Sequence, residues 1–458
     1  MKAFIFFLAL VISYTVGAQS SWKPLGPNGG LVSQGSSARS EYPSITTDSA
    51  GVPYIAYLDI SDSLRLMIKE FDGTNWVNVG NLGYHLRGGK PNIVVSPNDT
   101  LYVGYYNFND SSKPTVIKFD GTDWVQVGNP ISRGSGSFYE LSMVVDSNEQ
   151  LYIGYGAYSS GPSYPPGKAN IFTFDGTDWV PVGNTDFVQY SGRMSLRIGL
   201  NNELYLGYNT YYLTGHTPTS SWVQKWDGSG WDTVGTGFRY ITNIDIAPDG
   251  TVYTLHEGAA TGSGWYAVEK LVNNAWVQLG STQVYGYGWE VATDKQGTPY
   301  IAHAAAVQKY DGNNWFTIGN GAFAGSGGAH QVHIAFGKDN VPYVVRWFEP
   351  GQGIDRVDAY YYDSVVVNSV NNLSESILMQ LYPNPVRQGQ NIRLYLPFVQ
   401  EGDCYLTVYN ALGQQMYYER CMKETTPIVL PTETFPSGSY YIHLQTGQKK
   451  HAVSFIVY

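Results

Sequence analysis

The sequence predicts an all-β protein, a seven-bladed β-propeller closed by its N-terminal strand and followed by a small β-module. The first observation is a Trp-x-x-x-Gly motif that occurs seven times, its tryptophans between 39 residues (Trp276 to Trp315) and 55 residues (Trp124 to Trp179) apart. The second is a strand–turn–strand pattern upstream of the motif, and the third is an Asp-Gly hairpin between the two. A repeat of this length built from strands is typical of propellers. Composition agrees, because the chain has 52 Gly, 38 Tyr and only 14% charged residues.

The N-terminus predicts a secretory signal peptide over residues 1–18. Lys2 supplies a positive start, residues 3–12 are apolar, and Val16, Gly17 and Ala18 form a small-residue cleavage site. The apolar stretch is too short to span a bilayer, and no later segment has transmembrane character. No cysteine follows the site, which argues against a lipoprotein.

Each predicted blade begins with an apolar strand, a polar turn and a Tyr-containing strand. Asp, Asn and Gly cluster in the turns because they tolerate left-handed backbone conformations. Turn-forming explains these acidic residues better than a calcium loop, because carboxylates do not recur with ligand spacing. The seven copies are residues 48–57, 96–105, 146–155, 200–208, 247–256, 294–303 and 337–346.

A third strand then ends in an aromatic residue and Asp-Gly, which is a strong hairpin signal before the Trp strand. The copies are residues 71–73, 119–121, 174–176, 226–228 and 310–312, with a degraded copy at 270–274. The seventh unit has a third strand near 357–362 but no Trp strand after it. The first Trp strand, at 22–26, has no unit before it. The N-terminal strand is therefore expected to complete the last blade, giving a propeller over 19–363 without exposed edges.

The seven tryptophans are expected to pack between blades. Aromatic side chains bury a large apolar area, which a ring of thin sheets requires. The alternative is that they are platforms for sugars.

After Tyr362 the composition changes. Residues 364–377 are predicted to be a linker before a module at 378–458. The only two cysteines, Cys404 and Cys421, flank a predicted hairpin and are a candidate disulfide in an oxidising periplasm.

This module closely resembles the C-terminal sorting domain of type IX secretion cargo. The matching segments are YPNPV at 382–386, VYNALGQ at 408–414, PSGSYY at 436–441 and basic residues before the terminal strand. The resemblance implies a small β-sandwich that is handled by the type IX machinery, carries its cargo across the outer membrane and is then removed. It implies a protein that reaches the medium or the outer cell surface via the periplasm. The propeller is similar to uncharacterised propeller cargo that precedes such modules.

Cations and aromatic residues recur in the loops between each Trp strand and the next blade, on the face where the chain enters each innermost strand. Arg binds carboxylate or sulfate bidentately, and aromatic rings stack on sugars, so these loops predict a mouth suited to an acidic glycan. Ordinary solvated loop residues are the alternative. The candidate binding residues are Tyr84, His85, Arg87, Arg133, Tyr139, Tyr190, Arg193, Arg239, Tyr240, Tyr287, Trp289 and His330.

The sequence favours a secreted or surface binding protein that contacts glycan or protein and is not an enzyme. One alternative is a polysaccharide lyase or glycoside hydrolase at the mouth, with His85, His330 and His333 as candidate bases but no assigned catalytic residue. Another is a structural or adhesive surface component. No cofactor is predicted, and no cluster has metal-ligand spacing. The net charge of −10 and the lack of a basic run argue against a nucleic-acid partner.

Overall fold

The computed structural model divides the chain into two compact units, Gln19–Ser364 and one that holds Val365–Tyr458. The structure describes residues 21–33, 40–81, 86–131, 137–158, 169–184, 191–211, 218–238, 241–257, 265–280, 284–285, 290–303, 306–319, 323, 329–349, 355–363, 380–395, 404–411, 414–421, 427–446 and 449–458. The predicted signal peptide and the linker lie outside these residues.

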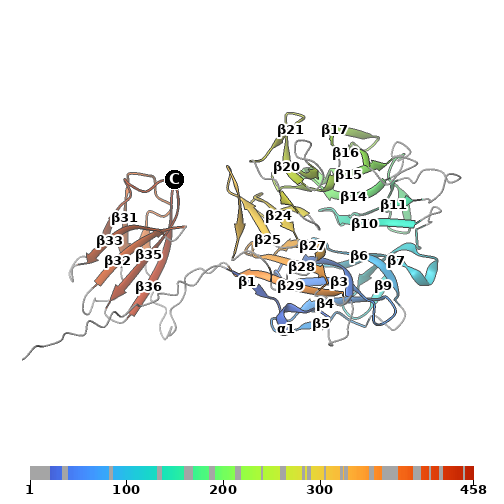
Figure 1. Cartoon of the computed structure of the whole chain (residues 1–458), viewed down its shortest axis with the longest axis horizontal. Coiled ribbons are helices and arrows are strands. Elements are labelled where there is room, and N and C mark those ends of the chain that lie inside the picture. The colour runs from blue at the N-terminus through green and yellow to red at the C-terminus, as the bar shows by residue number, and fades with distance from the viewer. Residues whose placement is uncertain are drawn as a thin grey trace, which may run out of the picture. The chain divides into compact units, whose positions relative to one another are not determined.

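The described part of the first unit forms seven antiparallel sheets of the propeller type (Figure 1). Each sheet has an innermost, a second, a third and an outer strand. The innermost strands are β2 (Ser40–Thr47), β6 (Gly88–Val95), β10 (Ser137–Val145), β14 (Ser191–Ile198), β18 (Ile241–Ile246), β23 (Glu290–Thr293) and β27 (Ala329–Phe336). Each of these contacts the next one around the ring, and β27 contacts β2.

The remaining strands pair outward from this ring. The second strands are β3 (Pro53–Asp59), β7 (Leu101–Asn107), β11 (Leu151–Tyr158), β15 (Leu204–Tyr211), β19 (Val252–Glu257), β24 (Pro299–His303) and β28 (Pro342–Phe348). The third strands are β4 (Arg65–Phe71), β8 (Lys113–Phe119), β12 (Ala169–Phe174), β16 (Pro218–Trp226), β20 (Trp265–Val272), β25 (Ala306–Tyr310) and β29 (Arg356–Asp363). The outer strands are β5 (Trp76–Asn78), β9 (Trp124–Gln126), β13 (Trp179–Pro181), β17 (Trp231–Phe238), β21 (Ala275–Gln278), β26 (Trp315–Ile318) and β1 (Ser21–Pro24). Short additions are β22 (Val284–Tyr285), which pairs with β20, and the turns α1 (Pro27–Gly30), η1 (Phe108–Asp110) and η2 (Leu200–Asn202).

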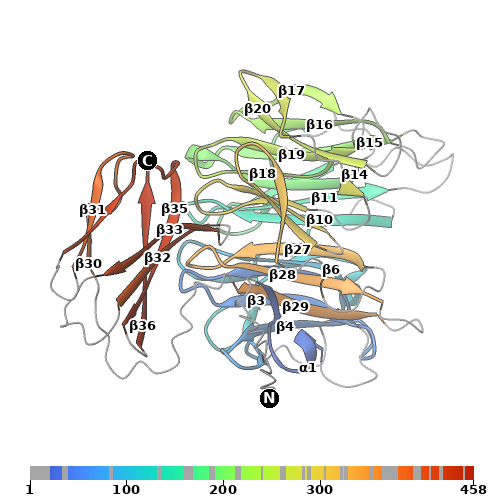
Figure 2. The ribbon, with the colours of Figure 1, turned by 60° about the vertical axis from the view of Figure 1, so that its left-hand side comes forward.

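The predicted closure by the N-terminal strand is confirmed. Strand β1 pairs with β29, with Trp22 opposite Tyr362, so the last sheet is completed by the start of the chain. In Figures 1 and 2, β28 and β29 lie beside β3 and β4, where the two ends of the propeller meet. This pairing covers the outer edge of β29 and makes the fold depend on residues more than 300 positions apart.

The Trp-x-x-x-Gly motif joins neighbouring blades. Trp179 is 8% exposed, and its indole N–H donates to the carbonyl of Val127 in the preceding blade (2.9 Å). Equivalent bonds run from Trp22 to Ile318, Trp76 to Leu25, Trp124 to Val79, Trp231 to Val182 and Trp315 to Leu279. Gly128 has φ +63°, and a Cβ there would lie 3.0 Å from Trp179, so the glycine makes room for the next tryptophan. The expectation of inter-blade packing is therefore met at these positions.

The Asp-Gly hairpins form because the aspartate caps its own turn. Oδ1 of Asp72 accepts hydrogen bonds from the backbone N–H groups of Thr74 (2.8 Å) and Asn75 (2.7 Å). These two bonds hold the pKa of Asp72 below its usual range. Asp120, Asp175, Asp227 and Asp311 make the same pair of bonds.

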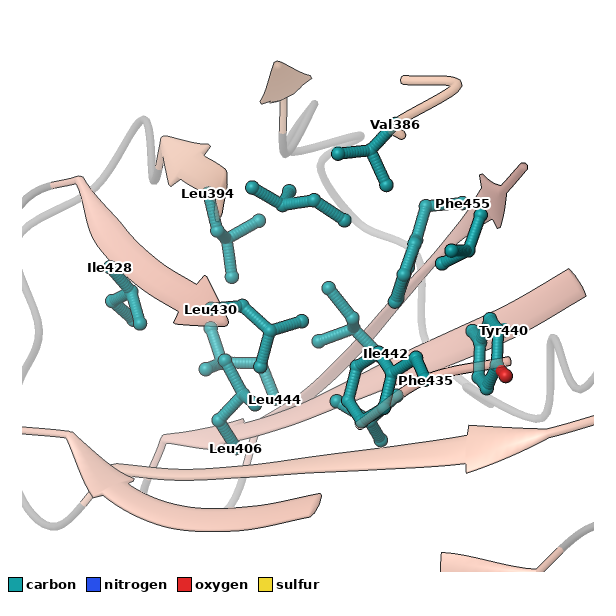
Figure 3. Close-up of a cluster of buried hydrophobic side chains, with 13 residues drawn as sticks. Val386, Leu394, Leu406, Ile428, Leu430, Phe435, Tyr440, Ile442, Leu444 and Phe455 are labelled. Atoms are coloured by element: carbon teal, nitrogen blue, oxygen red, sulfur yellow. The ribbon is translucent and has the colours of Figure 1, made fainter. Parts of the chain in front are cut away.

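The second unit contains two sheets around one core. One has the order β30 (Gln380–Tyr382), β31 (Asn391–Tyr395), β34 (Ile428–Pro431); the other has the order β33 (Gln415–Cys421), β32 (Cys404–Asn410), β35 (Gly438–Thr446), β36 (Lys449–Val457). Figure 3 shows the side chains that fill the space between them, among them Leu394, Leu406, Leu430, Ile442 and Phe455. This is the β-sandwich arrangement that the sequence resemblance implies.

Candidate functional site

A central pocket of about 140 Å³ lies where the innermost strands of the propeller converge. All seven innermost strands contribute to its wall. Its polar and aromatic lining residues are Tyr42, Ser44, Lys90, Asn92, Ser142, Ser195, Arg197, Asn243, Glu290, His330, Gln331 and His333. Half of these residues come from the first halves of their strands, the ends that follow the loops that the sequence singled out: Tyr42, Lys90, Asn243, Glu290, His330 and Gln331.

The innermost strands bulge at this level. The pairing register shifts between Glu41 and Ser44 in β2, and between Gly89 and Asn92 in β6, with comparable shifts in β10, β14, β18 and β27. A bulge re-aims side chains, and here it turns residues of a regular strand toward the pocket.

Two bulge residues have left-handed backbone conformations. Tyr42 has φ +52° and Lys90 has φ +47°, and each precedes a proline. Residues that are neither glycine nor asparagine rarely adopt such angles, and a following proline disfavours compact conformations further. A strained residue of this kind costs about 1–3 kcal/mol and is commonly found at functional sites.

A belt of polar side chains ties the innermost strands together around the pocket. The backbone N–H of Ile93 donates to Ser44 Oγ (3.1 Å), and that of Met143 donates to Asn92 Oδ1 (2.8 Å). The same bond links Leu196 to Ser142, Val291 to Asn243 and Ile334 to Glu290. Ser195 takes this position in β14, and its buried hydroxyl has no hydrogen-bond partner among the described residues.

Sequence reasoning missed this belt, although a signal for it exists. Each innermost strand carries a polar residue followed directly by an aliphatic one. The seven pairs are Ser44-Ile45, Asn92-Ile93, Ser142-Met143, Ser195-Leu196, Asn243-Ile244, Glu290-Val291 and His333-Ile334. A two-residue pattern is weak by itself, but its recurrence at the repeat period marks the pocket.

An ionic cluster occupies the side of the pocket formed by β14, β18, β23 and β27. Arg197 Nε lies 3.1 Å from Asp245 Oδ1, and Arg197 Nη2 lies 3.6 Å from Glu290 Oε1. Arg197 Nη1 also donates to the carbonyl of Leu196 (2.9 Å), so this guanidinium is engaged by three groups. Glu290 Oε2 in turn lies 3.4 Å from His333 Nδ1.

Glu290 is a carboxylate at neutral pH because of these neighbours. Burial alone would raise its pKa, but the hydrogen bond and charge of His333, the charge of Arg197 and the N–H of Ile334 together outweigh burial. The pKa of Glu290 therefore lies below its ordinary value. The Glu290 side chain is 14% exposed, which makes these interactions largely shielded from solvent.

We expect Glu290→Gln to lower the free energy of unfolding at pH 7 by about 1–3 kcal/mol, because it weakens hydrogen bonds to a charged, buried acceptor. A carboxyl group whose pKa is lowered on folding stabilises the fold above its unfolded pKa, about 4.3. That contribution is lost as pH falls through the folded value. The difference between the two proteins should therefore shrink below about pH 4. Urea unfolding followed by tryptophan fluorescence tests this; a difference independent of pH would contradict it.

An aromatic group lies at the part of the pocket formed by β2 and β27. The Trp347 ring lies 4.7 Å from the ring of Tyr42 and 4.7 Å from that of His330. The indole N–H of Trp347 donates to Asp355 Oδ1 (3.1 Å), which fixes the ring. The ammonium of Lys90 lies 5.9 Å from the Tyr42 ring centroid. Tyr42, Trp347, His330 and Asp355 are called the aromatic wall below.

The structure tests the predicted site residues only in part. His330 and His333 line the central pocket. Arg87 does not line it; its side chain is exposed, and its Nε–H donates to the carbonyl of Ser63 (2.7 Å). Arg193 in β14 and Tyr139 in β10 are described for their backbone only. The others, Tyr84, His85, Arg133, Tyr190, Arg239, Tyr240, Tyr287 and Trp289, lie outside the described residues, so an Arg-rich mouth stays a prediction.

Cys404 and Cys421 are opposite each other in the β32–β33 pairing. Their side chains lie outside the description, so the disulfide also stays a prediction. The described parts of the chain contain no group of three His, Cys, Asp or Glu side chains placed to hold a metal ion. They also contain no helix with the length and apolar character needed to cross a membrane.

Comparison with known proteins assigns the second unit. Residues 380–458 match the family described as the secretion system C-terminal sorting domain. This confirms the resemblance drawn from the sequence: these residues are a type IX sorting domain, and the chain carrying them is destined for the cell surface or the medium. No curated protein matches the chain.

Three solved structures illustrate the similarity of the propeller. A protein of unknown function from Dyadobacter fermentans is 11% identical, with a TM-score of 0.45, over 75% of this chain and 99% of that one. A PL25 ulvan lyase bound to -[GlcA(1-4)Rha3S]- is 10% identical, with a TM-score of 0.45, over 74% and 94%. A mutant Aleuria aurantia lectin in complex with α-methyl-L-fucoside is 12% identical, with a TM-score of 0.40, over 65% and 99%.

Proposed function

We propose that this protein is a secreted or surface-displayed glycan-binding propeller whose ligand site is the central pocket. The observation that carries the proposal is one pocket in which a strained tyrosine of the aromatic wall faces a belt of amide, hydroxyl and carboxylate groups. Ligand sites typically combine aromatic surface with a few placed polar groups, and the hydroxyl groups of a sugar both donate and accept hydrogen bonds.

The proposed export route uses both ends of the chain. Residues 1–18 act as the signal peptide, residues 364–377 as the linker, and the sorting domain is removed after passage through the type IX machinery. The propeller then stays attached to the outer surface or is released, and the loops of the entry face extend the contact with glycan or with a protein.

The proposal is tested by passing the purified chain over immobilised neutral and acidic polysaccharides. Retention that is lost on adding free polysaccharide supports a binding function. Absence of retention on the whole panel, with the native tryptophan fluorescence intact, would instead favour a structural or adhesive role.

A second candidate is catalysis in the same pocket, favoured by the contact between His333 and Glu290. A carboxylate beside an imidazole orients it and increases its basicity, which suits a general base that removes a proton from a bound sugar acid. The eluate of the retention experiment decides between the two candidates. Shortened chains with new ultraviolet absorbance from an unsaturated sugar would establish a lyase, and intact chains would leave the binding function.

A further inference from the structure

We propose that the central pocket binds one neutral pyranose ring, stacked on Tyr42, and discriminates against acidic sugars. This inference rests on the proposed function and goes further, because it names the ligand class and the residue that selects it. It also departs from the acidic glycan that the loop cations suggest.

The size of the pocket sets the size of the ligand. Its volume of about 140 Å³ is close to the roughly 150 Å³ of an engineered cavity that accepts benzene. A pyranose with its hydroxyl groups is larger than benzene, so the described walls hold at most one sugar ring. Its substituents and any second sugar unit have to extend toward the loops. The site accordingly suits the end of a chain or a side branch.

The aromatic wall supplies a platform for that ring. Tyr42 is half-buried and lines the pocket, and Trp347 supports it from behind at 4.7 Å. Asp355 fixes Trp347 through the indole N–H, so the platform is held in place before a ligand arrives. The strained backbone of Tyr42 fits this role, because the left-handed bulge is what turns the side chain into the pocket.

The charges around the platform disfavour an anion. Burial raises the pKa of Tyr42 most, and the nearby charges of Glu41 and Asp355 raise it further, so two carboxylates act on this ring beside the ammonium of Lys90. Arg197 is engaged by Asp245, Glu290 and a backbone carbonyl. A sugar hydroxyl can donate a hydrogen bond to these carboxylates, whereas a sugar carboxylate or sulfate is repelled by their negative charge.

Lys90 should affect the binding of neutral and acidic sugars in opposite directions. Its ammonium lies over the face of Tyr42, so a neutral ring that stacks there must displace it. An acidic sugar would use the same ammonium as its counter-charge. Lys90→Gly removes the ammonium and also relieves a left-handed backbone conformation that glycine adopts readily. The substitution should thus tighten binding of a neutral sugar, because no ammonium has to be displaced, and weaken binding of an acidic sugar.

The test uses the full chain and two readouts. Calorimetry measures binding of methyl glycosides of glucose, galactose, mannose, xylose and fucose, of methyl glucuronoside and galacturonoside, and of sulfated galactoside. Retention on the polysaccharide panel is measured for the same variants. We expect neutral glycosides to bind and Tyr42→Ala to weaken both readouts at least tenfold. Tyr42→Phe should stay within about threefold because the ring remains. Lys90→Gly should bind neutral glycosides more tightly than the natural protein does.

Failure of the neutral-ring inference and failure of the proposed function give different results. Binding of acidic glycosides alone, abolished by Lys90→Gly, overturns the neutral-ring inference but leaves the proposed function standing. Retention that Tyr42→Ala does not change, with the variant folded by its tryptophan fluorescence, also overturns the inference because the ligand then binds elsewhere. Neither retention nor binding for the natural protein defeats the proposed function itself.

Discussion

Replacing Trp179 with alanine should lower the free energy of unfolding of the propeller by about 3–5 kcal/mol. The indole is 8% exposed, packs against Phe174 at 5.5 Å and donates to Val127 of the preceding blade. Alanine removes the apolar contact, leaves a cavity and leaves the carbonyl of Val127 without this hydrogen-bond donor. All 12 tryptophans lie before residue 364, so urea unfolding followed by tryptophan fluorescence reports on the propeller without signal from the sorting domain.

Two variants control this experiment. Trp179→Phe keeps a ring but loses the hydrogen bond, and it should cost about 1–2 kcal/mol. Val180→Ala changes the next residue of the same strand, whose side chain is 36% exposed, and should stay within about 0.5 kcal/mol. If Trp179→Ala matched Val180→Ala in stability but weakened retention on polysaccharide, the tryptophans would be sugar platforms and not inter-blade contacts.

The fold could be predicted because its signals are local. An Asp-Gly turn specifies a hairpin through bonds within four residues, as Asp72 shows with Thr74 and Asn75. A tryptophan and a glycine recur at the same places in every unit, and each of these glycines makes room for an aromatic ring of the neighbouring blade. The unmatched Trp22 strand and the incomplete last unit then predict the closure, which the pairing of β1 with β29 confirms.

The pocket could not be predicted because its geometry depends on register. Asp245 and Glu290 follow Arg197 by 48 and 93 residues in sequence, and both meet it only because three innermost strands lie side by side. The bulge that turns Tyr42 and Lys90 into the pocket comes from the pairing of β2 with β3 and of β6 with β7. The sequence analysis pointed to the loops, where charged residues are conspicuous. Among its candidates whose side chains the structure describes, His330 and the candidate base His333 line the pocket and Arg87 does not.

The second large effect concerns a buried ion pair in the last sheet. Arg346 is 1% exposed, and its guanidinium makes a two-point contact with Asp358, Nε to Oδ1 at 3.0 Å and Nη2 to Oδ2. Phe323, Phe348 and Tyr360 surround it at 4.8–5.1 Å from their ring centroids. We expect Asp358→Leu to lower the free energy of unfolding by about 3–5 kcal/mol, because it leaves an uncompensated charge in an apolar site.

The double variant Arg346→Met/Asp358→Leu should recover most of that loss, since an apolar pair of similar volume has no charge to desolvate. The exposed pair of Arg65 and Asp62, 3.2 Å apart, is the matched control: Asp62→Asn should cost less than about 1 kcal/mol. Equal losses for Asp358→Leu and the double variant would show that the pair contributes by packing and not by charge. Because β28 and β29 carry this pair and β29 also receives β1, its loss should loosen the N-terminal closure first. Faster proteolysis near Trp22 in Asp358→Leu, but not in Asp62→Asn, would reveal that order of events.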